Sequence, residues 1–506
     1  MSAAEPTPSA PVDATEDGVG WRRMHPVTPL LKGWKVVVAV LVVGWAQVGD
    51  DLRHVADVLG GHGWMFALGG LVLVALVAVT WSGIAWRATR FAVTDEAVHI
   101  RQGVVFRQQR QARLDRLQAV DLVQPLLARL VGLAELRLEV AGGSGSRVSL
   151  AFLRESDAVA LRAELLALAA GLRRPDAAGP AATAPVGSSS VPGPVPVGAG
   201  GATARVAAPA FETAPEQVLY ELPMPRLLVS IALSGGTLWL AVGLVALVVA
   251  AVSGAPAEAL FSVVPLVFGL ASWFWARLNG AATFRAATSP DGIRLRHGLT
   301  ETRSQTVPPG RVQAVRLSQP LLWRGKDWWR VQVNVAGYGA EGQSRESETV
   351  LHPVATRDEA MTALWLVLPD LGVDDPRAAV DAGLSGLDDA GGYTAAPRRA
   401  RWVDPVGWRR HGVLVTRRAL LLRSGRLWRR LDVVPHERTQ SLGLEQGPIQ
   451  RRLKVASVVA HSTPGPVTPR VEHLDAMAAS ALLDEQAARA RQARRAAGPE
   501  QWMRSR

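Results

Sequence analysis

The sequence predicts an α+β membrane protein, with about four transmembrane helices in two hairpins and three copies of a small β-rich domain. Each copy is closed by a C-terminal helix. Three observations predict this class: long apolar segments without charge, a set of landmark residues that occurs three times, and alternation of apolar and polar residues within each repeat. The 506 residues are enough for several domains, since one domain usually takes about 100–200 residues.

Four apolar segments are candidates to cross a membrane. They are Val36–Gly49, Trp64–Trp86, Leu227–Val252 and Ala259–Ala276. A hydrocarbon core of about 30 Å needs about 20 helical residues, so the first and shortest segment is adequate only if flanking lysines extend to the interface. The alternative is a set of buried helices in a soluble protein, but such helices rarely stay uncharged on every face over this length.

The short flanks of these segments set the expected orientation. Arginine and lysine gather before the first segment, after the second, before the third and after the fourth, whereas the two intervening turns hold one arginine between them. Positive charge in short flanks favours the cytoplasmic side. Both termini and all large segments are therefore expected in the cytoplasm.

Three glycines, three arginines and three glutamines mark the repeat. The equivalent positions are Gly103, Gly298 and Gly425; Arg116, Arg311 and Arg438; and Gln118, Gln313 and Gln440. The interval from glycine to glutamine is the same in every copy, and a further glutamine follows at one fixed interval, at Gln124, Gln319 and Gln446. Identical spacing at three places predicts three equivalent folds, with each glycine at a hairpin that needs positive φ.

Within each copy the apolar residues alternate with polar ones, as in Val331, Val333 and Val335. This period is typical of a half-buried antiparallel strand. A helix then closes each copy: Ser156 is the expected N-cap for 157–172, Thr356 for 357–368, and the third helix is expected over about 474–495. Strands followed by one helix predict a small sandwich or a partly open barrel.

The expected domain limits follow from these patterns. They are a disordered tail over 1–20, a transmembrane hairpin over 21–90, a first β-rich domain over 91–172, a disordered linker over 173–215, a second hairpin over 223–280, a second domain over 281–370, a linker over 371–396, a basic third domain over 397–496 and a tail over 497–506. Pro, Ala, Gly and Ser dominate the longer linker, which cannot bury enough apolar surface to fold.

The run from Gln124-Pro125 through the apolar residues to Val140-Ala141-Gly142-Gly143, preceded by Arg116-Leu117-Gln118, resembles the bacterial membrane-flanked domain family. Its soluble unit is a pleckstrin-homology-like (PH-like) domain. Residues 21–172 carry the pattern best, 223–370 repeat it, and 401–495 form a degenerate copy without its own helix pair. The resemblance implies a seven-stranded sandwich with a C-terminal helix, a multi-pass protein of the bacterial plasma membrane, and no established enzymatic activity. It does not imply phosphoinositide binding.

The positive charge lies at the C-terminal end. Residues 397–506 hold 22 Lys and Arg against 9 Asp and Glu, while the whole chain has a net charge of +12. A stretch that mixes cations with indoles begins this part: Arg398, Arg399, Arg401, Trp402, Trp408, Arg409 and Arg410. We expect it to contact anionic lipid headgroups or a protein partner, with nucleic acid as the less favoured ligand.

Catalytic, cofactor and metal sites are not expected. The chain has no cysteine, and it lacks phosphate-binding glycine loops and helical metal motifs. His54, Asp57 and His62 share one predicted turn, but we interpret them as an incidental polar loop. The repeated arginines could bind lipid phosphate or a partner, although pairing with a neighbour such as Asp115 or Glu437 is favoured, and the repeated glutamines are expected to satisfy backbone groups.

The favoured function is a non-enzymatic scaffold that presents PH-like domains at the inner leaflet, with envelope integrity or stress as a candidate role. One alternative is a lipid-handling transporter or flippase-like protein, against which the uncharged helix interiors count. Another is a membrane-tethered nucleic-acid binder that uses residues 397–506. The expected partners are anionic lipid and a protein, for which a smaller member of the same family is one candidate. No cofactor is expected.

Overall fold

The computed structural model describes residues 90–169, with gaps at 95, 104–106 and 141–146, and residues 217–496, with gaps at 255–256, 290–291, 309, 337–349 and 464, together with scattered positions before residue 90. The chain divides into two compact units, the first holding β1 to β4 and the second holding β5, β6 and all elements from β8 onward. The predicted span 36–49, most of the span 64–86, both predicted tails and the linker 173–215 lie outside the described residues.

The first copy holds seven strands and a closing helix. Its elements are β1 (Arg22–Arg23), β2 (Arg90–Val93), β3 (Ala97–Gln102), β4 (Gln108–Arg113), η1 (Leu114–Arg116), β5 (Leu117–Pro125), α4 (Leu126–Leu130), β6 (Leu133–Val140), β7 (Arg147–Arg154) and α5 (Glu155–Ala169). The closing helix begins at Glu155, before the expected N-cap Ser156.

The second copy repeats this order and inserts three helices after its first strand. Its elements are β8 (Gln217–Glu221), α6 (Met224–Ala232), α7 (Gly235–Val252), α8 (Ala257–Ala281), β9 (Arg285–Ser289), β10 (Gly292–His297), β11 (Glu301–Val307), β12 (Val312–Gln319), η3 (Leu321–Lys326), β13 (Trp329–Val335), β14 (Val350–Ala355) and α9 (Arg357–Val367). Thr356 is the N-cap of α9 and forms a capping box with Glu359, as the sequence predicted.

The third copy has two short 3-10 helices where the second copy has its helices. Its elements are β15 (Thr394–Ala395), η5 (Arg398–Trp402), η6 (Trp408–Arg410), β16 (Gly412–Val415), β17 (Ala419–Ser424), β18 (Arg429–Pro435), η7 (His436–Arg438), β19 (Ser441–Glu445), α11 (Pro448–Arg452), β20 (Val455–His461), β21 (Arg470–Asp475) and α12 (Ala476–Ala496). The closing helix α12 agrees with the predicted helix over 474–495.

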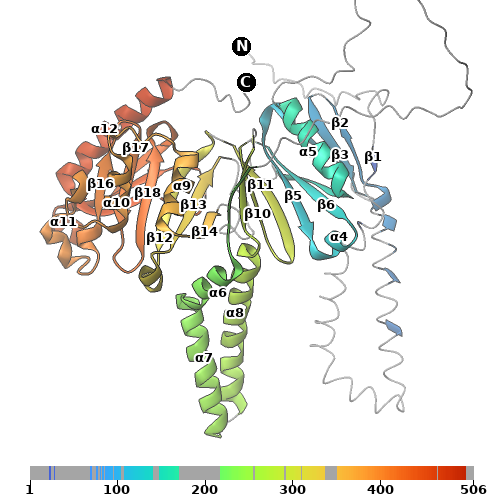
Figure 1. The fold of residues 1–506 in the computed structure, drawn as a ribbon, viewed down its shortest axis with the longest axis horizontal. Helices are drawn as coiled ribbons and strands as arrows, with labels where there is room; N and C mark the ends of the chain where they lie inside the picture. The colour runs from blue at the N-terminus through green and yellow to red at the C-terminus, as the bar shows by residue number, and fades with distance from the viewer. Residues whose placement is uncertain are drawn as a thin grey trace, which may run out of the picture. The chain divides into compact units, whose positions relative to one another are not determined.

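Consecutive copies share their sheets. One seven-stranded sheet has the order β7-β6-β5-β11-β10-β9-β8, and a second has the order β14-β13-β12-β18-β17-β16-β15. Each therefore joins the last three strands of one copy to the first four strands of the next (Figure 1). The joints are the antiparallel pairs β5–β11 and β12–β18. We expected each copy to be a separate domain, and the sequence did not predict this sharing of sheets.

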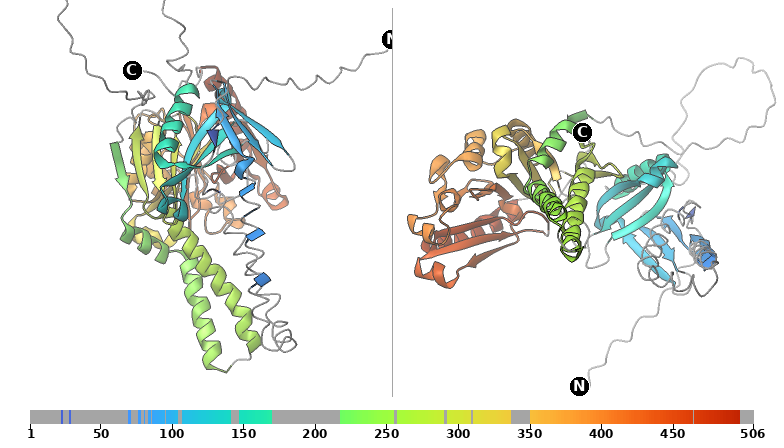
Figure 2. Two further views of the ribbon diagram at one scale, coloured as in Figure 1. Left: turned by 90° about the vertical axis from the view of Figure 1, so that its right-hand side faces the viewer. Right: turned by 90° about the horizontal axis from the view of Figure 1, so that it is seen from below.

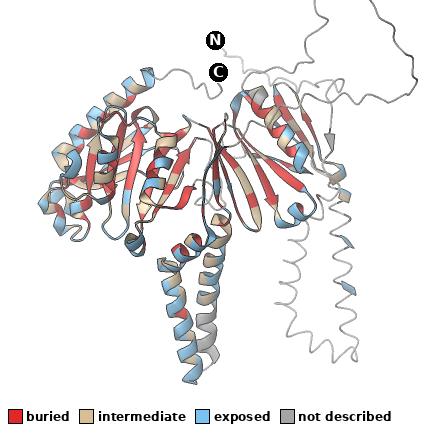
Figure 3. Cartoon of the chain, viewed as in Figure 1, coloured by how far each residue is buried: buried red, intermediate tan, exposed pale blue. Residues whose placement is uncertain are grey.

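The core crosses the second joint. Val315 and Leu317 of β12 lie opposite Val433 and Leu431 of β18, and all four are buried in one hydrophobic cluster. Burial of these pairs removes apolar surface from water and so stabilises the joint between the copies. The strands of both sheets are correspondingly coloured as buried along much of their length (Figure 3).

One helix within the described residues, α7, is long and apolar enough to cross a membrane, judged by length and composition alone. Four transmembrane helices are therefore not supported. The predicted span Leu227–Val252 is two helices: α6 ends at Ala232, and Ser234 then caps α7 by accepting a hydrogen bond from the Thr237 N–H at 3.4 Å. The predicted span Ala259–Ala276 lies in α8, which also contains Pro265 and continues past Arg277.

The helices α7 and α8 lie side by side and extend away from the strands (Figures 1 and 2). Only Gly243 of α7 is buried, while the Leu, Val and Trp side chains around it are largely exposed, including Trp239 at 67% and Val245 at 62%. A helix that is apolar on every face and exposed to this extent has no favourable contact with water.

The segment predicted as a linker over 371–396 is ordered. It contains α10 (Pro376–Ser385), whose Val380 and Leu384 are fully buried in the cluster that crosses the second joint, where the helix packs on β17 and β18 of the third copy. Asp375 caps this helix by accepting from the Ala378 N–H at 2.9 Å. The linker interpretation was wrong here because the Gly and Asp residues that break the apolar pattern flank a short amphipathic helix.

Candidate functional site

The helix α6 forms one wall of a cavity in the second copy. Its Leu227, Ser230 and Ile231 are buried, whereas Leu228 and Val229 on the other face are exposed. Spacing of three and four residues places the buried set on one side of the helix. The indole N–H of Trp323 donates to the Ser230 carbonyl at 2.9 Å and connects this face to η3, the turn between β12 and β13.

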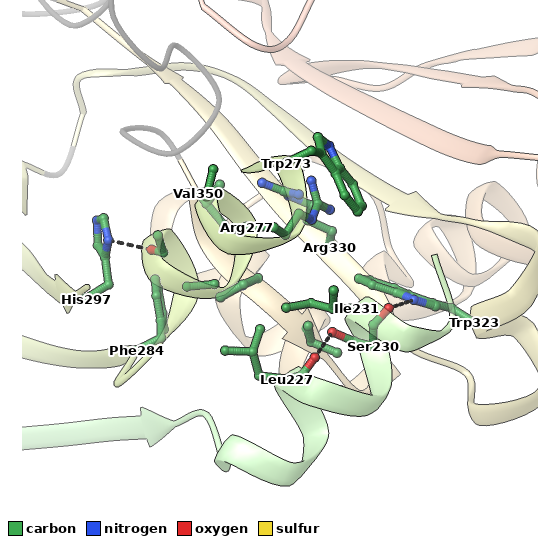
Figure 4. A pocket seen from close by; sticks show the side chains of 15 residues that line it. Leu227, Ser230, Ile231, Trp273, Arg277, Phe284, His297, Trp323, Arg330 and Val350 are labelled. Carbon is green, nitrogen blue, oxygen red and sulfur yellow. Dashed lines mark hydrogen bonds between the residues drawn. The ribbon is translucent and has the colours of Figure 1, made fainter. Parts of the chain in front are cut away.

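The cavity has a volume of about 290 Å³ and lies between α6, the end of α8 and strands β10, β13 and β14 (Figure 4). Leu227, Ile231, Phe284 and Val354 line it with apolar surface. Two guanidinium groups also line it, from Arg277 of α8 and Arg330 of β13. Apolar walls with a few cationic groups suit a ligand that has an anionic head and an apolar body.

Four rings form a stack beside this cavity. The ring of Tyr220 lies 4.4 Å from His352, and Phe284 lies 5.9 Å from His297 and 6.1 Å from His352. The Tyr220 hydroxyl donates to the Leu351 carbonyl at 2.7 Å. The stack links β8, β10 and β14 through Phe284, which lies just before β9.

Both histidines of the stack are uncharged near neutral pH. Burial is the main cause that lowers the pKa of His297 to about 4. The positive charge of Arg303 lowers this pKa as well, whereas the hydrogen bond to the Gly280 carbonyl raises it. The His297 Nδ1 lies 2.8 Å from that carbonyl and donates its hydrogen to it. Burial also lowers the pKa of His352 to about 4, against the opposing charge of Glu359. Neither ring nitrogen of His352 has a hydrogen-bond partner.

An ion pair closes the junction where α6 begins. Arg226 donates to Glu359 at 2.6 Å, and the same carboxylate accepts from the Thr356 N–H at 2.8 Å. The Glu359 carboxylate lies 3.7 Å from the His352 Nε2, so a protonated His352 would lie beside a carboxylate that is already paired with Arg226. The contact fixes α6 to the closing helix α9.

All three landmark glycines have positive φ: 110° at Gly103, 112° at Gly298 and 72° at Gly425. A Cβ at Gly298 would lie 2.0 Å from the Glu301 carbonyl oxygen, and one at Gly425 would lie 2.0 Å from that of Trp428. The predicted hairpin glycines are confirmed, and no other residue type fits two of these turns without strain.

The repeated arginines and glutamines do not gather at one site. Asp115, offered as a partner for Arg116, pairs instead with Arg113 at 2.9 Å. Gln313 is buried and donates to the Arg311 carbonyl at 3.4 Å, a backbone contact of the expected kind. Gln440 is exposed. The Arg438 side chain lies near Gly310, and the side chain of Gln118 is outside the described set.

The Arg/Trp stretch is divided between the interior and the surface. Arg410 is 2% exposed and donates to the Gly386 carbonyl at 2.6 Å and the Gly383 carbonyl at 3.0 Å, and burial lowers its pKa to about 9. A headgroup contact by Arg410 is therefore wrong, because its side chain lies inside the third copy.

Two more arginines of this stretch are paired with carboxylates. Arg409 binds Asp388 at 2.5 Å, and Arg399 binds Asp475. Trp408 packs on the small cluster of Ala396 and Ala400. What remains on the surface is Arg398, Arg401 and Trp402, with Trp402 71% exposed and the Arg401 guanidinium 5.3 Å from its ring.

The family model described as the bacterial PH domain matches residues 38–169, 228–365 and 391–490. The chain belongs to the bacterial PH domain family. No curated protein and no solved structure matches it. The three matched regions follow the three copies, so each copy of the bacterial PH domain contributes its first four strands to one sheet and its last three to another.

Sequence reasoning missed the cavity of the second PH domain. Leu227 and Ile231 were assigned to a membrane span, and Trp323, Arg330 and His297 come from separate strands and loops. The one usable signal was Pro223 before an amphipathic turn, which favours a short helix start. Within the part of the chain that the structure describes, no group of three or more His, Asp or Glu side chains could hold a metal ion. The turn with His54, Asp57 and His62 lies outside that part.

Proposed function

We propose that the chain is a non-enzymatic scaffold at the inner face of a bacterial plasma membrane, anchored by helix pairs and presenting three bacterial PH domains in the cytoplasm. Membership of the bacterial PH family supports a membrane-associated or lipid-binding role. The observation that carries the proposal is α7, an 18-residue helix that is apolar on every face and, apart from the side that packs against α8, largely exposed. Lipid tails would cover this surface at no cost.

The two-hairpin arrangement is part of the proposal. The helices α7 and α8 leave the second PH domain after β8 and return before β9. The matched region 38–169 begins within the apolar segment 36–49 of the first copy, so a second helix pair before β2 is in keeping with the family pattern. Basic flanks at Arg226 and Arg277 favour a cytoplasmic location for the ends of the second pair.

The absence of native cysteine makes the topology testable. A cysteine at Ser253, in the turn after α7, should react with a membrane-impermeant thiol reagent in intact cells. A cysteine at Ser462 of the third PH domain should react only after lysis. Reaction of Ser462→Cys in intact cells, or protection of Ser253→Cys before and after lysis, would contradict the arrangement.

The third PH domain is proposed to touch the lipid surface without helices of its own. Between β15 and β16 it has η5 and η6, in the place where the second copy has α6 to α8 between β8 and β9. The exposed Arg398, Arg401 and Trp402 lie in this replacement segment. Each arginine near an anionic surface contributes about 1 kcal/mol, and an indole favours the headgroup region.

This contact can be measured in the full chain reconstituted in nanodiscs. A fluorophore on Trp402→Cys should be quenched by lipid-borne quenchers when anionic lipid is present, and less so in high salt. Adding Arg398→Gln and Arg401→Gln should remove most of the quenching, whereas a fluorophore at Ser385→Cys of α10 serves as the control. Equal quenching at both sites would refute the contact. Displacement by double-stranded DNA would favour the nucleic-acid alternative.

A second candidate function, lipid handling, has the cavity of the second PH domain in its favour. Arg277 and Arg330 could hold an anionic headgroup while the apolar walls hold the start of an acyl chain. Native mass spectrometry of the purified chain should then find bound anionic lipid, reduced in Arg330→Gln and unchanged in Arg296→Gln, an exposed arginine of β10. Equal lipid in the two variants would remove the basis for this candidate.

A further inference from the structure

The two joints between PH domains have the same register. In the first, Gln124 lies opposite Thr302, and in the second, Gln319 lies opposite Arg429. Gln124 and Gln319 are equivalent in the repeat, and Thr302 and Arg429 each lie four residues after a landmark glycine. One rule therefore describes both joints: the strand with the landmark glutamine of one copy pairs with the fourth strand of the next.

The rule would also join two strands that have no such partner within the described residues, one in the first copy and one in the third. Within the described residues, β4 of the first copy pairs only with β3, and β19 of the third copy pairs only with β20. Residues 107–111 are exposed, as are Leu444, at 45%, and Glu445. Each strand therefore presents an open edge of backbone donors and acceptors.

The edge at β19 resembles the edge of β12, which β18 occupies at the second joint. At the second joint, Gln319 donates to the Trp328 carbonyl at 3.3 Å and accepts from Arg429 at 3.2 Å. Gln446, its equivalent, donates to the Val455 carbonyl at 3.1 Å, and Val455 is the residue equivalent to Trp328. No hydrogen bond to the Gln446 Oε1 is found among the described residues. The residue equivalent to Arg429 is Arg107, on the open edge at β4.

Arginines on β4 do not prevent such pairing. β18 carries Arg429 and Arg430 at its start and still forms the second joint, and β11 of the first joint is as polar as β4. On the opposite edge Glu445 pairs with Arg470 at 2.9 Å, and its carboxylate is still exposed enough to accept from an arginine of a second chain. The closing helix α12 packs against β19, and its Arg494 donates to the Thr439 carbonyl at 2.6 Å, two residues before the strand, while Leu444 and Glu445 remain accessible.

We propose that chains associate head to tail, with β19 of one chain pairing with β4 of a second copy in the register of the internal joints. The rule places Gln446 opposite Arg107, Glu445 opposite Gln108 and Gly443 opposite Arg110. Because the two edges differ, the contact is heterologous and extends into a ring or an open filament. This inference goes beyond the scaffold role and stands on strand pairing alone.

Disulfide trapping tests the register. Two differently tagged full-length chains in detergent, one with Gln108→Cys and the other with Glu445→Cys, should form a disulfide, since directly opposed Cα atoms lie about 4.5–5.5 Å apart. The matched control replaces Gln108→Cys by Arg113→Cys, about 17 Å further along the same strand. We expect at least fivefold more heterodimer from the first mixture. Equal yields would overturn the proposal, and so would a double variant Q108C/E445C that closes only within one chain.

Charge reversal tests the association without a covalent bond. Arg107→Glu with Arg110→Glu should abolish the concentration-dependent increase in mass seen by analytical ultracentrifugation, because Glu445 would then face like charge. These side chains are exposed, so folding should be unaffected. Arg296→Glu, an exposed arginine away from the edge, should associate like the wild type. A wild-type chain that stays monomeric at all concentrations would refute the proposal.

Discussion

Lowering the pH from 7.5 to 5 should loosen the junction between α6 and the second PH domain. His297 and His352 lie in one ring stack there, and burial lowers the pKa of each to about 4. An unfolded histidine has a pKa of about 6.5, so the unfolded state binds more protons between these values. Stability from the neutral rings is present above pH 6.5 and is lost as the pH falls towards 4.

The size of the effect follows from the two pKa values. At pH 5 each histidine favours the open state by a factor of about 30, or about 2 kcal/mol, so the pair contributes about 4 kcal/mol. Glu359 is not part of this change. Its burial raises its pKa, but the Thr356 N–H and Arg226 outweigh this and lower it, so it protonates below the window considered.

Hydrogen exchange followed by mass spectrometry can measure this opening in peptides from α6 and β14. The wild-type chain should lose protection between pH 7.5 and 5 by about a thousandfold after correction for the intrinsic rate. In His352→Phe about half of the loss, on a logarithmic scale, should disappear, because neither ring nitrogen of His352 forms a hydrogen bond and a phenyl ring fills the same stack. His461→Phe, at an exposed position, is the control. Identical pH dependence in wild type and His352→Phe would refute the reasoning.

Two further predictions concern the joints and hairpins. Asp432→Asn should reduce the hydrogen-exchange protection of β12 and β18 by about 3 kcal/mol. The Arg316 guanidinium, which binds Asp432 at 2.6 and 2.8 Å, would then lack its buried counter-charge. The double replacement Arg316→Met with Asp432→Leu should restore most of the lost protection. Gly298→Ala should lower the melting temperature through a loss of about 2 kcal/mol or more, because φ is 112° and the Glu301 carbonyl is in the way, whereas Gly325→Ala, with open space around it, should not.

Local features of the repeat were predictable because they depend on residues close in sequence. The positive φ at Gly103, Gly298 and Gly425, the cap at Thr356 and the extent of α12 all follow from turn and capping chemistry. The split at Ser234 was missed because an apolar run hides a helix break when the breaking residue is small and its flanks are apolar on both sides.

Long-range choices could not be read from the pattern. The alternation of apolar and polar residues predicts that β12 is half-buried, but it does not predict which strand lies beside it. The partner strand β18 is more than 100 positions later in the chain. The burial of Arg410 was hidden for a related reason: its partners are the carbonyls of Gly383 and Gly386, in a segment that the sequence assigned to a linker. A guanidinium held by backbone carbonyls and one held at a lipid surface look alike in a sequence.

Sheet sharing gives a physical reason why the third PH domain can lack counterparts of α6 to α8. In the second copy, α6 and α8 cover one end of the domain, with Leu227 and Ile231 of α6 in its core and Leu278 of α8 packed against it. In the third copy η5 and η6 bury only Ala400 and Arg410, so they add little apolar area. The missing stabilisation is offset by the β12–β18 ladder, by the apolar pairs across it and by the Arg316–Asp432 ion pair. An isolated third domain would lose all three at once, so its stability depends on the second PH domain.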